Sequence, residues 1–214
     1  MTAKKLNIFS MQLKLLESPY LWEALTGVLL ANQKAIDFAD TTSLEAQQSG
    51  DDEYIQVVAD EQSELVENLV GCCFVACQTY ITGVVSTTMT LHATAKKQGV
   101  ILTSTNGTRP AIVRTASPCV AATPITIVEA IEALANYYKH NDEWGVDWSK
   151  ASGRSAPTIA ALVPLGLVSG STGNLRTGLK AIGIQLVSLA DILRDWQLAL
   201  TSAYQTELKS FGLL

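Results

Sequence analysis

Residues 68–95 read NLVGCCFVACQTYITGVVSTTMTLHATA and contain no Asp, Glu, Lys or Arg. They are the second half of a helical region that we expect over residues 51–98, whose first half is acidic. An unbroken helix of this length would measure about 70 Å, at ~1.5 Å per residue. Such a helix is longer than a typical domain, so it either projects from the domain or bends, near Gly71 or Gly83. We expect the uncharged half inside a helical bundle.

The same stretch is long enough to cross a membrane. However, it contains Gln78, His92 and repeated threonines, and its apolar residues are mostly Val, Cys, Ala and Gly. A lipid-facing helix is normally richer in Leu, Ile and Phe. The composition therefore favours a buried helix and no stable membrane insertion, with a membrane-associated helix over residues 69–91 as a less favoured alternative.

On the N-terminal side, the dipeptide Ser18-Pro19 is typical of a helix start. Apolar residues then recur at helical spacings of three and four. These residues are Leu21, Leu25, Val28, Leu29 and Ile36. The polar segment at residues 47–52 breaks this pattern and separates the first helical region from the second.

On the C-terminal side, Thr126 and Glu129 have the spacing of a capping box. The helix that they open is expected to end near Trp144-Gly145. A closing helix follows, with an apolar stripe of Leu186, Leu189, Leu193, Trp196, Leu200, Tyr204 and Leu208. Residues 99–124 and 146–178 are rich in Gly, Pro, Ser and Thr. The pattern predicts one all-α domain over residues 1–214, a helical bundle of about four to five helices with two long irregular loops.

The composition limits the possible partners and compartments. The formal net charge is −5, so no global basic field attracts nucleic acid. Charged residues make up 16%, against about a quarter in typical domains. Either much of the surface is polar and uncharged, or a partner covers part of it. The four cysteines are too few and too bunched for a disulfide framework, and no signal peptide is apparent, which together indicate a cytoplasmic protein.

Two possible ligand sites have unsuitable spacing. The glycine-rich stretch at residues 173–180 lacks the Lys directly after its second glycine that a phosphate-binding loop needs. Cys73, Cys77 and His92 could suggest a metal site, but on one helix His92 lies more than about 20 Å along the axis from Cys77. Metal ligands must reach a single ion. We therefore expect neither a metal nor another cofactor.

The chemically richest stretch is residues 136–144. If the helix continues through it, Glu132, Asn136 and His140 lie one turn apart on the face opposite the apolar stripe. Lys139 and Glu143 share this face. A nearby carboxylate can orient an imidazole for proton transfer, and an ammonium group can contact phosphate. The alternative is the ordinary solvent-facing side of an amphipathic helix.

The segment ALANYYKHNDEW at residues 133–144, near the end of a bundle helix, resembles the HEPN superfamily of helical-bundle proteins. This resemblance implies a homodimer that acts as a metal-independent RNase, or as a catalytically silent companion, in a bacterial defence or toxin–antitoxin system. Asn136 matches the family's polar motif position and His140 its histidine, but Ala135 occupies the arginine position. The resemblance thus implies His140 for proton transfer, Asn136 as its organiser and Lys139 as the phosphate contact.

Glu143, on the same face, completes the candidate catalytic set. RNA or a protein is the partner that this hypothesis implies. A second hypothesis belongs to a different class, a non-enzymatic interaction or scaffold subunit of a larger assembly. It is motivated by the low charge content, the long uncharged stretch and the polar loops, which suggest a surface covered by partners.

Overall fold

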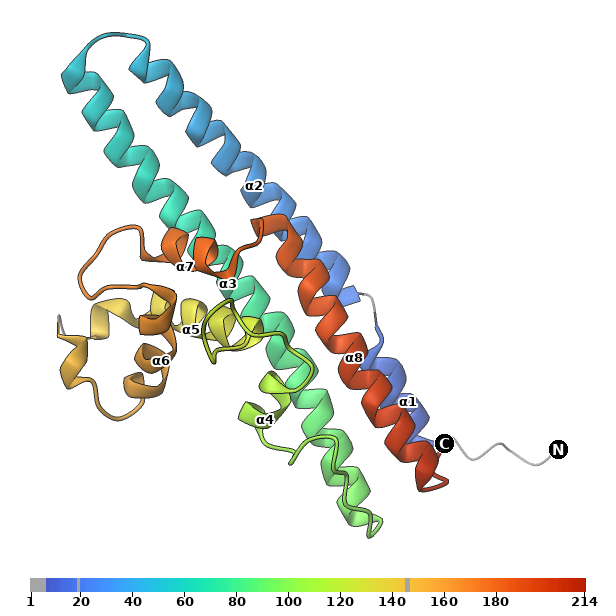
Figure 1. The fold of residues 1–214 in the computed structure, drawn as a ribbon. Coiled ribbons are helices and arrows are strands. Elements are labelled where there is room, and N and C mark those ends of the chain that lie inside the picture. Colours follow the sequence, from blue (N-terminus) through green and yellow to red (C-terminus); the bar gives the residue numbers. More distant parts are fainter. Residues whose placement is uncertain (1–6, 19, 145–146) are drawn as a thin grey trace.

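The computed structural model describes residues 7–18, 20–144 and 147–214, and in these residues the protein is all-α, as predicted (Figure 1). The helices are α1 (Ile8–Leu16), α2 (Tyr20–Gln47), α3 (Asp52–Lys97), α4 (Arg109–Arg114), α5 (Ile127–His140), α6 (Ser155–Leu162), α7 (Asn174–Ile182) and α8 (Leu189–Ser210). Their number exceeds the expected four to five. Most of the buried apolar side chains form one continuous cluster.

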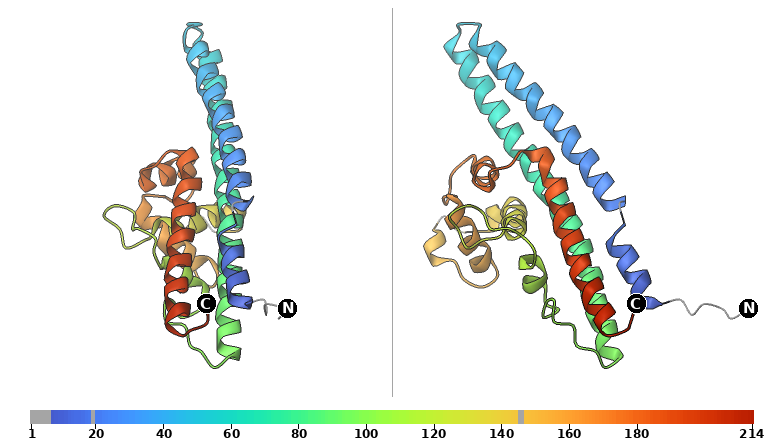
Figure 2. Two further views of the ribbon diagram at one scale, coloured as in Figure 1. Left: turned by 90° about the vertical axis from the view of Figure 1, so that its right-hand side faces the viewer. Right: turned by 45° about the vertical axis from the view of Figure 1, so that its right-hand side comes forward.

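The fold is organised by a long hairpin of α2 and α3 (Figures 1 and 2). Helix α3 runs unbroken for 46 residues through Gly71 and Gly83, so it projects rather than bends. At its start, the Asp51 carboxylate accepts hydrogen bonds from the backbone N–H groups of Glu53 and Tyr54, both at 3.1 Å. This cap satisfies two of the free N–H groups of the first turn.

The uncharged half of α3 lies in the interior, where Cys73, Phe74, Cys77, Ile81 and Leu91 are all fully buried. It packs against α1, α2, α5 and α8. By length and composition α3 could cross a membrane, and half of its most apolar window is buried by the rest of the protein. Core helices of soluble proteins share these properties. The absence of membrane insertion therefore stays a prediction.

Helix α5 crosses α3 and begins at the predicted capping box. The Thr126 hydroxyl accepts from Glu129 N at 3.3 Å, and a Glu129 carboxylate oxygen accepts from Thr126 N at 3.0 Å. The helix ends at His140, earlier than expected, and a 3-10 turn, Asn141–Glu143, follows. The predicted end of this helix is Trp144-Gly145, and Gly145 lies outside the described residues.

The two regions expected to be irregular contain additional helices. Residues 99–124 include α4, and residues 146–178 include α6 and the start of α7. These helices are six to nine residues long, so their own helical propensity is marginal and tertiary packing stabilises them. Ile112 and Val113 of α4 are buried, as is Leu162 of α6.

Helix α8 closes the bundle beside α1 and α2. It begins at Leu189, so Leu186 of the predicted stripe falls in the preceding 3-10 turn. The Arg194 guanidinium donates hydrogen bonds to the carbonyls of Glu17 and Ser18, both at 3.3 Å, and thereby holds the end of α1. The sequence predicts a helix start at Ser18-Pro19. Pro19 lies outside the described residues, and helix α2 is described from Tyr20.

Candidate functional site

The side chain of Gln78 on α3 forms hydrogen bonds with the polar face of α5. The Gln78 amide donates to Asn136 Oδ1 at 2.9 Å, and its oxygen accepts from Lys139 Nζ at 2.6 Å. Two of the predicted site residues, Asn136 and Lys139, are therefore held in a network that the sequence pattern does not reveal. The amide of Asn136 is organised by α3 and the Lys139 ammonium has a partner within the fold.

The other two predicted residues form a separate pair. His140 Nδ1 lies 3.2 Å from Glu143 Oε1, and both side chains are exposed. Within the described parts of the chain, no hydrogen bond connects this pair to Asn136 or Lys139. The predicted residues thus lie near one another at the end of α5, but they form two pairs rather than one interacting set.

The carboxylate of Glu132 is occupied by an arginine from α4. Arg109 forms an ion pair with Glu132 and donates to Thr82 Oγ1 at 3.1 Å. Burial raises the pKa of the Glu132 carboxyl above its usual range, although the Arg109 guanidinium opposes the shift. Glu132 lies eight residues from His140, about 12 Å along the helix axis. Arg109 therefore does not share a single phosphate site with His140.

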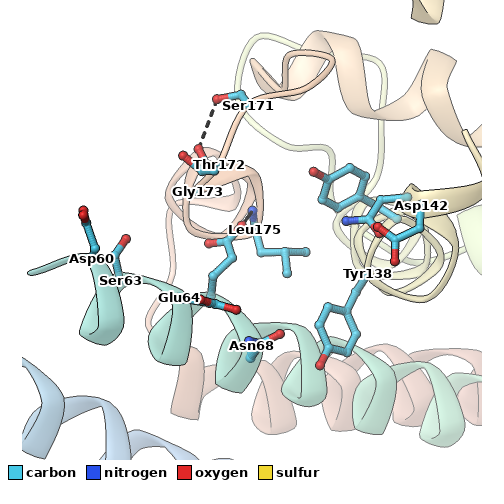
Figure 3. Close-up of a pocket in the computed structure, with 13 residues that line it drawn as sticks. Asp60, Ser63, Glu64, Asn68, Tyr138, Asp142, Ser171, Thr172, Gly173 and Leu175 are labelled. Carbon is cyan, nitrogen blue, oxygen red and sulfur yellow. Dashed lines mark hydrogen bonds between the residues drawn. The ribbon is translucent and has the colours of Figure 1, made fainter. Parts of the chain in front are cut away.

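A groove of about 780 Å³ opens beside the C-terminal end of α5 (Figure 3). Helix α3 forms one wall, the last turn of α5 and the following 3-10 turn form another, and the start of α7 closes the third. The lining residues are Asp60, Ser63, Glu64, Glu67, Asn68, Tyr137, Tyr138, Asn141, Asp142, Ser171, Thr172, Gly173 and Leu175. The groove contains residues from the predicted segment 136–144, but not His140, Asn136, Lys139 or Glu143.

The groove is acidic. Four carboxylates line it, and no Lys, Arg or His is among its described lining residues. Glu67 has a structural role, because its carboxylate accepts from the backbone N–H groups of Leu175 at 2.6 Å and Arg176 at 3.3 Å at the start of α7. Among the described residues, the carboxylates of Glu64 and Asp142 have no hydrogen-bond donor. A concave site lined by negative charges raises the local concentration of positively charged ligands.

An aromatic cluster stands beside this groove. The rings of Tyr137, Trp144 and Trp148 contact one another with centroid separations of 5.8, 5.9 and 6.2 Å. All three line an adjoining cavity of about 250 Å³ that shares Asn141 and Asp142 with the larger groove. The buried amide of Asn174 positions Tyr137 through a hydrogen bond of 2.9 Å to its hydroxyl.

Tyr138 lines the groove where α5 crosses α3. Its ring lies directly over Gly71, where an added Cβ would overlap the ring carbons. Its hydroxyl is 3.6 Å from Cys72 Sγ. The glycine thus lets α5 approach α3 closely enough for Tyr138 to line the groove.

The structure supports no metal centre in the residues that it describes: no group of three or more His, Cys, Asp or Glu side chains could hold an ion there. Burial raises the pKa of the Cys73 thiol to about 12 and raises that of Cys77 further, as expected for packing residues. Searches against protein-family models, curated proteins and solved structures found no match to this chain.

Proposed function

We propose that the protein is a non-enzymatic interaction subunit whose groove binds a basic segment of a partner protein. The observation that carries this proposal is the composition of the groove wall. Carboxylates and aromatic rings line it together, with no cationic side chain among the described lining residues. These are the two kinds of group that bind an Arg or Lys side chain, through charge-assisted hydrogen bonds and cation–π contacts.

The dimensions of the groove suit several side chains of an extended segment. Ligand pockets commonly enclose about 300–1,000 Å³, and this groove of about 780 Å³ lies within that range. Glu64 is available on α3 and Asp142 faces the groove from the opposite wall (Figure 3). A guanidinium or ammonium group between these walls would receive carboxylate partners from both sides.

The same features disfavour nucleic acid in this groove, because its carboxylates repel phosphates. Outside the groove, Lys139 is hydrogen bonded to Gln78 and Arg109 is paired with Glu132. In the segment that resembles the HEPN motif, Ala135 occupies the position of the motif arginine, and it is fully buried. A catalytically silent role is therefore better supported than an RNase role.

Calorimetric titration with a short Arg-Gly repeat peptide tests the proposal, with a Gln-Gly peptide of equal length as the control ligand. We expect salt-sensitive binding of the basic peptide alone. The double substitution Glu64→Gln with Asp142→Asn should weaken it about tenfold or more, since each hydrogen bond to a charged group contributes about 1.5–3 kcal/mol. The matched control is Glu23→Gln with Asp195→Asn, exposed carboxylates outside the groove lining. Equal affinity of both double variants would refute the assignment.

A second proposal retains a metal-independent RNase of the HEPN type. It is supported by the exposed His140 imidazole, which is paired with Glu143 and open to a substrate. Incubation of the purified protein with a panel of RNAs, beside His140→Ala, tests it. Cleavage that depends on His140 would favour this enzyme over the binding subunit, and no cleavage by the parent protein would exclude it.

A further inference from the structure

The charge of the chain is divided between two regions. Residues 20–67, which form α2 and the first third of α3, carry eleven acidic residues and one lysine. The rest of the chain carries nine acidic and fourteen basic residues. The acidic region includes the end of the α2–α3 hairpin, which extends beyond all the other helices (Figures 1 and 2). We call this end, residues 38–65, the arm.

The arm has little core of its own. Only Ala39, Ala46 and Val58 are buried along it. Its larger apolar side chains point outward: Phe38 is 72% exposed, Leu44 59%, Tyr54 50%, Val57 51% and Leu65 43%. Exposed apolar groups on a projecting element, among charges of one sign, are typical of a surface that a partner covers.

The opposite end of α3 has the complementary character. We call it the base, formed by the end of α3, residues 98–104 and the end of α8. Lys96, Lys97 and Lys209 are exposed there, together with Ile101 and Phe211 at 78% and 49%. Among the described residues none of these lysines has an ion-pair partner.

Hydrogen bonds hold the base together. The Glu207 carboxylate accepts from the Thr103 hydroxyl at 2.8 Å, and from the Ser104 hydroxyl and backbone N–H at 2.6 and 3.0 Å. These bonds join residues 98–104 to α8, so the basic and apolar groups of the base form one surface.

We propose that two copies of the chain pair antiparallel, with the arm of each lying on the base of the other. The arm is acidic and the base is basic, and both contain exposed apolar side chains. They lie at opposite ends of a helix about 69 Å long. A twofold axis across the helix brings both arm–base contacts together at once and closes the assembly at two subunits. Parallel pairing would instead place arm against arm, with acidic groups facing one another.

Sedimentation equilibrium of the full chain tests this proposal. We expect twice the 22.9 kDa chain mass at low salt and partial dissociation at high salt. Reversal of the base, Lys96→Glu with Lys97→Glu, should give a monomer, and so should Glu45→Lys with Glu61→Lys on the arm. The four substitutions combined should restore the dimer, which shows that the separate variants are folded. The control variant, Lys150→Glu with Arg154→Glu, changes the net charge by the same amount at residues outside the base.

A monomer at all concentrations, or a dimer that persists in both reversed variants, would overturn the proposal. Larger open polymers would also overturn it, because they would show head-to-tail contacts without closure. Among the substituted residues, none lines the groove beside α5. The arm does share Asp60, Ser63 and Glu64 with the groove lining. The reversed variants leave these three residues intact, so loss of the dimer and loss of peptide binding are measured on separate substitutions.

Discussion

Substitution of Gly71 by alanine probes the contact that places Tyr138 in the groove. An ideal Cβ at this position would lie 2.5 Å from both Cγ and Cε2 of the Tyr138 ring, so the ring must move. Overpacking of this kind costs about 1–3 kcal/mol. Alanine in place of glycine within a helix returns about 1 kcal/mol. We expect Gly71→Ala to lower the free energy of unfolding by up to about 2 kcal/mol.

Gly27→Ala is the matched control, because Gly27 lies within α2 and nothing approaches its added Cβ within 4 Å. It gains the helix contribution without the overlap, so it should stabilise the protein by about 1 kcal/mol. In thermal denaturation the two variants should differ by about 1–3 kcal/mol, at about 2–4 °C per kcal/mol for a chain of this size. Equal shifts in Tm would refute the close contact between α3 and Tyr138. In a Tyr138→Ala background, Gly71→Ala should no longer destabilise the protein.

The capping box and the half-buried His92 give two further predictions. Thr126→Ala removes the N-cap of α5 and should cost about 0.5–2 kcal/mol, measured by urea denaturation, whereas the exposed Thr41→Ala should change stability little. Burial lowers the pKa of His92 from its ordinary 6.5, although Glu207 opposes the shift. Its contribution to stability is therefore complete above about pH 6.5 and lost as the pH falls below that value. Tm should drop between pH 7.5 and 5.5, less so in His92→Gln, and an equal drop in both proteins would contradict this.

The helices that the sequence predicts well are those with local signals. The cap at Thr126 depends on residues three positions apart, and the interior half of α3 is visible in its lack of charge. Helices α4, α6 and α7 have no such signals, because they are short and lie among glycines and prolines. Their stability comes from tertiary packing, such as the close contact between Gly178 and Leu134.

The candidate site shows the same division between local and tertiary information. The sequence pattern points to residues 136–144 and, within them, to the helical polar face. The groove instead uses Tyr137, Tyr138 and Asp142, together with acidic residues of α3 that lie 70 or more positions earlier. The periodicity of α5 gives no information about the wall of the groove that α3 forms. The spacing of Asp60 and Glu64, one turn apart on α3, is the one local signal that could have indicated it.

The binding of a basic segment beside α5 is tested most directly by the indole N–H resonances of the four tryptophans. Trp144 and Trp148 line the cavity that adjoins the groove, whereas Trp22 and Trp196 line neither. On addition of the Arg-Gly peptide, we predict that the signals of Trp144 and Trp148 shift while the other two stay in place. Peptide binding with unmoved Trp144 and Trp148 signals, or with shifts at Trp22 or Trp196 alone, would contradict the account.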